Sequence, residues 1–150
     1  MAKLALNKIL EVAGTNYPAP FDELVKGRIR QRLGDAGGLT QFGVNRIQLP
    51  PGCWSSQRHW HAEEDEFVHV LAGEVVLVTD KGEEVLRAGD CAAFPANSGD
   101  GHHLINRGEV AAVYLEIGSR SPTERVTYPD IDLAWDEQTN AYLHVDGKPY

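Results

Sequence analysis

Three histidines and one glutamate have the residue types and the spacing of a metal site. His59 and His61 flank Trp60, and Glu66 follows after a short turn within HWHAEEDEFVHVLAGE. Residues i and i+2 of a β-strand point to the same face, so two imidazoles at this spacing can share one ion. His102, in DGHHLIN, must reach them from a distant strand. The set predicts a mononuclear metal site inside a closed or sandwiched β structure.

The donor set restricts the metal to one divalent transition ion per chain. Imidazole and carboxylate donors suit Zn, Fe, Mn, Ni, Co or Cu, and the set is too rich in nitrogen for Mg or Ca. An octahedral ion would keep two positions open for water, substrate or dioxygen, whereas a tetrahedral ion would keep none. Each imidazole must be neutral to bind, so we expect metal occupancy and thermal stability to fall together below about pH 6.

Composition excludes several classes of partner. The 150 residues are enough for one domain with its own core, and the net charge of −8 comes without any long run of Lys or Arg. We therefore expect no nucleic acid partner. No apolar stretch approaches the roughly 20 residues of a membrane span, which predicts no membrane insertion and no export. Cys53 and Cys91 lack metal-site spacing, so we interpret them as reduced, buried thiols of a cytoplasmic protein, with a disulfide as the less favoured alternative.

The order of the segments predicts an all-β chain with two flanking pieces. Residues 1–24 form a short helix over 2–13 and a linker, 25–118 form the β domain, and 119–150 form an arm ending in a small hairpin. The arm would pack across the barrel or across a second subunit. Short alternating segments with Gly-rich turns between them indicate a jelly-roll barrel. The strands are expected near residues 56–61, 66–71, 74–79, 83–87, 91–94, 102–106 and 110–117, after earlier alternating segments in 26–33 and 41–49.

Other polar residues are weaker candidates. Gln57 shares the parity of His59 and would line the pocket, as would Tyr114 or Glu116, which are the candidate catalytic residues. Arg30 is a candidate substrate ligand because alternating arginines can clamp an anion, although we favour an exposed edge strand that uses charge to block aggregation. The remaining assignments are structural: His69, His103 and His144 as surface or core imidazoles, and 63–65 as a solvated hairpin tip.

These residues resemble the two motifs of the cupin superfamily. The first motif is matched by Pro51, Gly52, His59, His61, Glu66 and Gly73, with one extra residue between Gly52 and His59. The second is matched by Gly89, Pro95, His102 and Asn106, with Asn97 where the family has Gly and with a longer Pro-to-His spacing. The spacing to Asn106 selects His102 over His103. The resemblance spans roughly residues 43–118 and implies a small single-domain double-stranded β-helix, commonly a homodimer, with the metal near the barrel mouth.

The resemblance implies a broad range of activities. We expect a metal-dependent enzyme of isomerase or lyase type that acts on a small polar metabolite, a carbohydrate or an organic acid. The metal would act as a Lewis acid, with Glu116, Tyr114 or bound water as the base. The alternatives are a metal-dependent dioxygenase and a non-catalytic, metal-stabilised binding or sensor protein.

Overall fold

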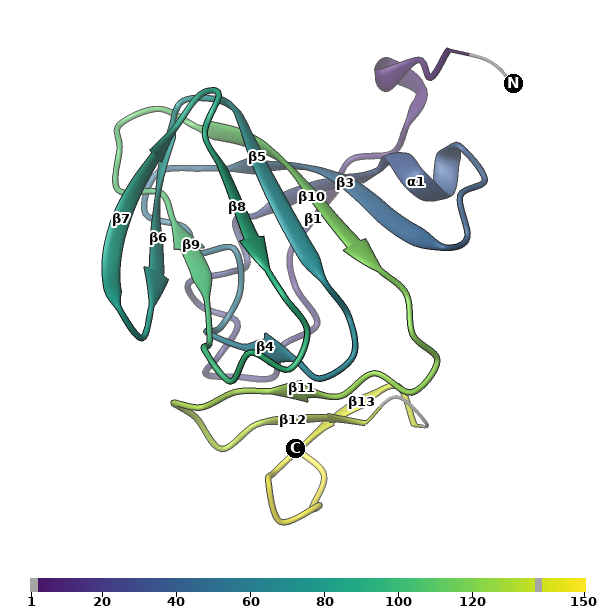
Figure 1. The fold of residues 1–150 in the computed structure, drawn as a ribbon, viewed down its shortest axis with the longest axis vertical. Helices are drawn as coiled ribbons and strands as arrows, with labels where there is room; N and C mark the ends of the chain where they lie inside the picture. Colours follow the sequence, from purple (N-terminus) through teal and green to yellow (C-terminus); the bar gives the residue numbers. More distant parts are fainter. Residues whose placement is uncertain (1–2, 137–138) are drawn as a thin grey trace.

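The chain folds as an all-β double-stranded β-helix in which two sheets face each other. The computed structural model describes residues 3–136 and 139–150. Figure 1 shows the larger sheet on one side, the smaller sheet β7-β6-β9 on the other, and a third sheet across the end of the barrel. The predicted fold class is confirmed.

The larger sheet carries most of the pocket described below. Its strand order is β1-β2-β3-β10-β5-β8, and every pair in it is antiparallel. Side chains alternate between its two faces, so each strand offers every second residue to the barrel interior. The strands are β1 (Val12–Ala13), β2 (Ile29–Arg32), β3 (Phe42–Leu49), β5 (Glu66–Ala72), β8 (Cys91–Phe94) and β10 (Ala112–Ser119).

The hydrophobic core lies between the larger sheet and the three-stranded sheet. The smaller sheet consists of β6 (Glu74–Thr79), β7 (Gly82–Arg87) and β9 (His103–Ile105). Inward residues of both sheets are almost fully buried, and burial of this apolar surface is the main stabilising contribution. The buried cluster comprises Ile47, Leu49, Val68, Val70, Val75, Leu77, Leu86, Leu104, Ala112 and Tyr114.

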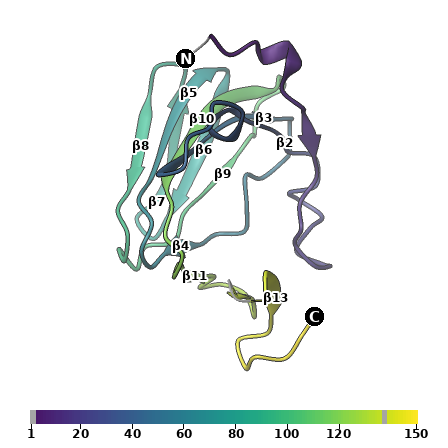
Figure 2. The ribbon, with the colours of Figure 1, turned by 90° about the vertical axis from the view of Figure 1, so that its right-hand side faces the viewer.

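A third sheet closes one end of the barrel. Its order is β13-β12-β11-β4, with β4 (Trp60–His61), β11 (Val126–Thr127), β12 (Ala134–Asp136) and β13 (Ala141–Leu143). Figure 2 shows this sheet lying below the barrel with the C-terminus beneath it. β11 pairs directly with β4, so His61 sits opposite Val126. The segment after residue 119 therefore packs on the strand that carries the His59–His61 motif, and its residues 137–138 lie outside the described part.

The predicted helix over residues 2–13 is wrong. Among the described residues of this segment there is only a 3₁₀ turn, η1 (Leu6–Lys8), followed by strand β1. The side chain of Gln31 donates hydrogen bonds to the carbonyl oxygens of Leu6 and Ile9, at 2.9 and 3.0 Å, so tertiary contacts satisfy groups that a helix would have used. The α-helix that the described residues contain is a single turn, α1 (Leu33–Ala36). No helix among the described residues is long and apolar enough to span a membrane.

Most predicted strands lie where the alternation placed them, and three expectations fail. The segment 56–61 forms a strand only at its end, in β4, because residues 51–58 make turns and bends around the barrel mouth. The favoured edge-strand interpretation of the arginines is also wrong, since β2 lies between β1 and β3. Finally, Cys53 and Cys91 are free thiols, but neither is fully buried as expected. Cys53 is half-buried, and Cys91, on β8, is exposed.

Two residues of the resemblance have clear structural roles. Gly73 turns the chain between β5 and β6 with a φ of 72°, and a Cβ there would lie 3.0 Å from the Cα of Ala112. Asn106 is fully buried, and its amide nitrogen donates to the carbonyl oxygens of Leu49 (2.7 Å) and Val110 (2.8 Å). Its Oδ1 accepts from the backbone N–H of Gly108 at 2.9 Å. Asn106 thus joins the end of β9 to β3 and to the loop at 108–110 through hydrogen bonds to backbone groups.

Replacing Asn106 tests this role. We expect Asn106→Ala to lower the free energy of unfolding by roughly 2–4 kcal/mol, because two carbonyl oxygens and one N–H would lose their buried partner. Chemical denaturation measures the change. Arg107→Ala is the matched control, since it removes only an exposed ion pair with Glu83 and should leave stability unchanged. Equal stability of both variants would contradict the assignment.

Candidate functional site

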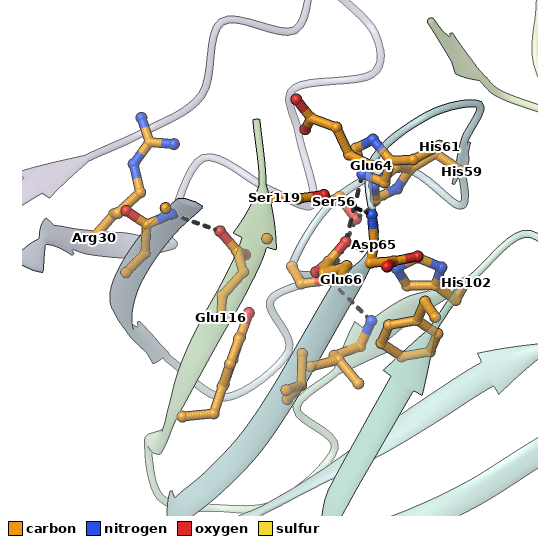
Figure 3. Close-up of a pocket in the computed structure, with 18 of the residues that line it drawn as sticks. Arg30, Ser56, His59, His61, Glu64, Asp65, Glu66, His102, Glu116 and Ser119 are labelled. Carbon is orange, nitrogen blue, oxygen red and sulfur yellow. Dashed lines mark hydrogen bonds and ion pairs between the residues drawn. The ribbon is translucent and has the colours of Figure 1, made fainter. Parts of the chain in front are cut away.

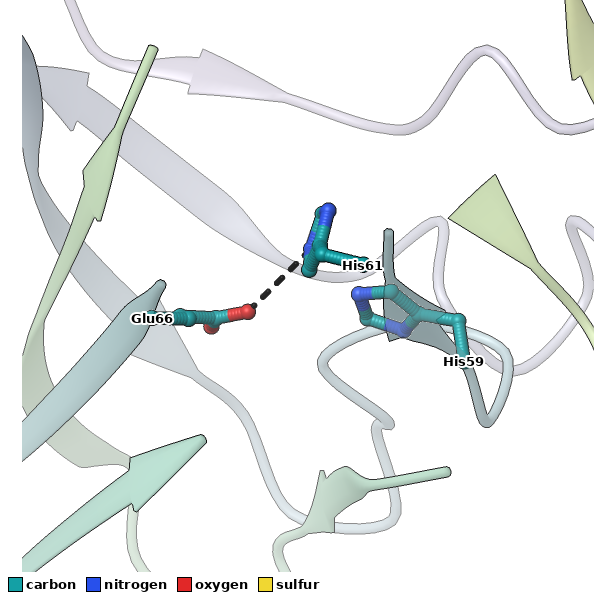
Figure 4. A group of neighbouring side chains, drawn as sticks. All are labelled: His59, His61 and Glu66. Carbon is teal, nitrogen blue, oxygen red and sulfur yellow. Dashed lines mark ion pairs between the residues drawn. The ribbon is translucent and has the colours of Figure 1, made fainter. Parts of the chain in front are cut away.

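The structure brings the four sequence-predicted metal ligands together at the barrel mouth. Donor atoms of His59, His61 and Glu66 all lie within 4.8 Å of one another. Figure 4 shows these three side chains pointing toward a common space. Glu66 Oε2 is 3.4 Å from His61 Nε2 and 3.1 Å from His102 Nε2. His102 is also stacked on Phe94, with the ring centroids 3.6 Å apart.

Different elements hold these side chains in place. His59 and His102 form a two-way backbone bridge, with N···O distances of 3.1 and 2.8 Å, which fixes the two imidazoles side by side. His61 ends β4 and Glu66 begins β5, so the turn between them sets their separation. His103 lies on the other side of the chain, where its ring packs edge-on against Trp54 and its Nδ1 contacts the carbonyl oxygen of Ser56.

The tautomer of His59 is set by the backbone. Its Nδ1 lies 2.9 Å from the carbonyl oxygen of Gln57, an acceptor that requires a proton on Nδ1. Nε2 of His59 therefore carries a lone pair, which is the arrangement of a metal-binding imidazole held by a neighbouring acceptor.

The electrostatics of the cluster keep the Glu66 carboxylate ionised and the His59 imidazole neutral. Burial lowers the pKa of His59 to about 3, so this ring is neutral at pH 7. Burial opposes ionisation of Glu66, but hydrogen bonds from His102 and His61 outweigh it and hold the pKa of Glu66 well below its usual range. Burial also lowers the pKa of His61, yet the hydrogen bond and charge of Glu66 outweigh it and leave that pKa raised. The site thus presents an ionised carboxylate to any cation.

The ligand cluster forms one wall of a cavity of about 350 Å³. The cavity runs across the inner face of the larger sheet from β5 to β2, and this volume suits a small metabolite. Figure 3 shows Glu116 on β10 between the histidine cluster and Arg30. Glu116 Oε1 accepts a hydrogen bond of 2.9 Å from Asn45 Nδ2 on β3, which orients the carboxylate within the cavity.

Comparison with known proteins decides the family. A family model described as "Cupin domain" matches residues 45–118. A crystal structure from Silicibacter pomeroyi, described as a sugar phosphate isomerase from a cupin superfamily, is 46% identical with a TM-score of 0.93, covering 99% of this chain and 96% of that one. The chain belongs to the cupin superfamily.

Further solved structures resemble this cupin over most of its length. A candidate sugar phosphate isomerase from Acidithiobacillus ferrooxidans is 33% identical with a TM-score of 0.71, over 79% of this chain and 76% of that one. A polyketide cyclase from Streptomyces resistomycificus shares the fold, with a TM-score of 0.71, 18% identity and 87% coverage of both chains. Among curated proteins, none matches significantly.

The donor atoms of this cupin fit a metal ion. Bonds of about 2.1 Å place neighbouring ligand atoms about 3.0 Å apart at right angles, or about 3.4 Å apart in a tetrahedron. The measured separations from Glu66 Oε2 are 3.1 and 3.4 Å. In addition, imidazole nitrogens and a carboxylate oxygen are the donor types that divalent transition ions accept. The cluster could therefore hold one ion.

The other candidate residues of this cupin fall into two groups, those that line the cavity and those that only support the fold. Arg30, Tyr114 and Glu116 line the cavity. Gln57 does not, because its side chain donates a 2.7 Å hydrogen bond to the carbonyl oxygen of Phe21. The parity argument for Gln57 assumed a strand, and the chain there is irregular. Tyr114 is buried, and its hydroxyl has no well-formed hydrogen bond among the described residues.

The sequence interpretation missed Glu124, which lies in the segment after the barrel. Its carboxylate is buried, accepts backbone N–H groups of Ala62 (2.9 Å), Glu63 (3.2 Å) and Arg125 (2.8 Å), and lies 3.7 Å from Nδ1 of His61. An acceptor behind a ligand imidazole favours the tautomer that presents Nε2 to the ion. Nothing in the sequence distinguishes Glu124 from the other acids, because only the folded arm brings it to β4.

Removing one ligand imidazole should weaken metal binding more than removing a residue that contacts only the ligands. We expect His61→Ala to raise the dissociation constant for Zn²⁺ or Ni²⁺ by more than roughly a hundredfold, since outer-sphere residues alone contribute ten- to a hundredfold. Isothermal titration calorimetry measures it. His69→Gln, on the outer face of β5, is the control and should bind as the wild type does. A dissociation constant unchanged in His61→Ala would exclude this cluster as the metal site.

Metal affinity should also depend on pH. A proton on His61 competes with the ion, and the raised pKa of His61 moves this competition above the value of 6.5 for a free imidazole. The apparent affinity is therefore constant at higher pH and falls about tenfold per pH unit once the pH drops below the pKa of His61. Metal titrations between about pH 5.5 and 8.5 follow the transition. An affinity that stays constant down to pH 6 would contradict this assignment.

Proposed function

We propose that this cupin is a metal-dependent isomerase that interconverts the aldose and ketose forms of a sugar phosphate. The observation that carries the proposal is the 46% identity, over 99% of the chain, to a protein described as a sugar phosphate isomerase. The cavity supports it, because the ligand cluster and the Glu116 carboxylate face the same space. Sugar phosphates are small polar metabolites, as expected from the sequence.

Glu116 is suited to be the base in this reaction. Isomerisation moves one proton from C2 to C1 and another from the C2 hydroxyl to the C1 oxygen, with no net change in composition. A carboxylate above the C1–C2 bond can take the C2 proton and return it to C1. Asn45 holds Oε1, and among the described residues no hydrogen bond engages Oε2 of Glu116.

Tyr114 is suited to be a hydrogen-bond donor to the substrate. Burial raises the pKa of its hydroxyl far above the usual value, so the phenol keeps its proton throughout the physiological range. It lies one inward position before Glu116 on β10, which places donor and base on the same strand. The proton on the Tyr114 oxygen can stabilise negative charge on a sugar oxygen.

His59, His61, Glu66 and His102 would hold the metal. A divalent ion bound there would polarise the substrate carbonyl and make the adjacent C–H more acidic. Phe94 and Leu104 line the cavity beside this cluster and exclude water from that wall, which strengthens the electrostatic interactions within it.

Substitution of Glu116 tests the proposal. With metal-loaded protein and a panel of pentose and hexose phosphates in D₂O, we expect isomerisation with deuterium incorporated at the exchanged carbon, measured by NMR. Glu116→Gln should lower kcat by about 10²–10⁴-fold with metal content unchanged, because the amide cannot accept the proton. Glu84→Gln, on the exposed strand β7, is the control.

Other outcomes would replace the proposal. Oxygen consumption with a redox-active metal would identify a dioxygenase, and elimination products would identify a lyase. Saturable binding of the panel without any turnover would identify a binding protein.

A further inference from the structure

A row of arginines, in β2 and just before it, lines one side of the cavity. Arg28, Arg30 and Arg32 alternate along the chain, and all three line the cavity. Arg30 pairs in register with Ile47, whose side chain faces the barrel interior. Figure 3 shows Arg30 on the opposite side of Glu116 from the histidines. The inward face of β2 is therefore positively charged.

Every acidic side chain of the cavity already has a partner. Asp35 is bound by Arg120 and lies 3.8 Å from Arg32, which leaves Arg32 at a solvent-exposed rim. The remaining four acids are likewise engaged: Glu64 by the N–H of Ser121, Asp65 by the N–H of Ala96, Glu66 by His61 and His102, and Glu116 by Asn45. None of these carboxylates forms an ion pair with Arg30.

The guanidinium of Arg30 and the Nε atom of Arg28 lack hydrogen-bond acceptors among the described residues. No ion pair or hydrogen bond engages the guanidinium of Arg30 among the described residues, and Nε of Arg28 is buried with no acceptor. Nη1 of Arg28 donates 2.7 Å to the carbonyl oxygen of Ser55, which fixes the side chain. Burial, with Arg28 and Arg32 close by, lowers the pKa of Arg30, although Glu116 and Asp35 act in the opposite sense. Half-buried cations without partners are costly, and an anion between them would offset that cost.

We propose that Arg28 and Arg30 bind the phosphate group of a phosphorylated substrate. A phosphate monoester carries a charge of about −1.5 to −2 at pH 7, with three acceptor oxygens that match the fixed donors of a guanidinium. This inference deepens the proposed function and rests on it for the identity of the substrate. It also replaces the interpretation of these arginines as protection of an exposed edge.

The width of the sheet fits a substrate with two functional ends. β2 and β5 are separated by three strand spacings, about 14 Å, and the side chains from each strand extend into the space between them. On the inward face, Gly43 and Gly118 are paired across β3 and β10 and contribute no side chain of their own, while the guanidinium of Arg120 lies 3.8 Å from the position that a Cβ of Gly43 would take. An open-chain sugar phosphate can lie across this face, with its phosphate at Arg30 and its carbonyl end at the metal ligands.

The test compares two arginines on opposite faces of the same sheet. The probes are a pentitol 5-phosphate, which has no carbonyl to react, the unphosphorylated pentitol, and the corresponding aldonic acid, which carries a carboxylate instead. Isothermal titration calorimetry of metal-loaded protein gives each affinity. We expect the phosphate to bind wild type at least tenfold more tightly than the pentitol and than the aldonic acid. Arg30→Gln should lower affinity for the phosphate roughly ten- to a hundredfold and leave affinity for the pentitol unchanged.

Arg46→Gln is the matched control. Arg46 lies on β3 with its side chain on the outer face, where it donates to Gln31 at 3.2 Å, and it does not line the cavity. This variant should keep the wild-type affinity for the phosphate. Arg30→Lys, which keeps the charge and loses the planar donor pair, should recover part of the affinity. Metal content and melting temperature of Arg30→Gln should match the wild type, which separates a lost contact from a damaged fold.

The results separate this inference from the proposed function. Isomerase activity with an unchanged KM and unchanged phosphate affinity in Arg30→Gln would overturn the subsite and leave the isomerase standing. Arg30-dependent binding of the pentitol phosphate without isomerase activity would support the subsite and overturn the reaction. Equal affinity of wild type for the aldonic acid and the phosphate would overturn the assignment to phosphate and indicate a carboxylate site.

Discussion

One buried carboxylate, that of Glu66, organises the mouth of this barrel. It contacts the imidazoles of His61 and His102, and those contacts keep it ionised in spite of its burial. The charge in turn raises the pKa of His61, while His59 remains neutral through burial and its backbone contact. A negative charge held among neutral nitrogens favours a cation at their centre. The cluster therefore attracts a proton or a metal ion.

The inner face of the larger sheet changes character along its strands. Towards one end, Ile47, Leu49, Val68 and Val70 contribute to the core, and towards the other, Asn45, Glu116 and Glu66 face the cavity. Because inward positions recur every second residue, each strand contributes both core and cavity residues without any change in its backbone. The fold and the site thus share the same strands, and the paired Gly43 and Gly118 add no side chain of their own where the polar rows begin.

The sequence predicted the barrel well because alternation and turn residues are local signals. The strands β5, β6 and β8 lie within one residue of their expected limits, and the four ligand positions meet at one place. Contacts between residues far apart in the chain could not be predicted from the sequence. The expected helix over residues 2–13 was replaced by η1 and β1, held by the side chain of Gln31. Glu124 reaches His61 only because β11 pairs with β4. Likewise, the carboxylates at 63–65 accept hydrogen bonds from Ala96, Ser121 and Thr123 and are not a purely solvated tip.

The arginine row shows why net charge is a poor guide to a binding site. The chain as a whole carries −8, which disfavours anions at long range. Inside the cavity the local arrangement differs, because each carboxylate already has a hydrogen-bond or ion-pair partner, whereas Arg30 has none among the described residues. Salt screens the distant charges over about 10 Å, whereas the contact with a half-buried guanidinium is screened much less. A small anion that enters the cavity therefore meets a field set by Arg28 and Arg30 and by the cluster of His59, His61, Glu66 and His102. The carboxylate of Glu116 lies between these two ends, so an anionic substrate must keep its charged group at the arginines and present its neutral carbons to the base.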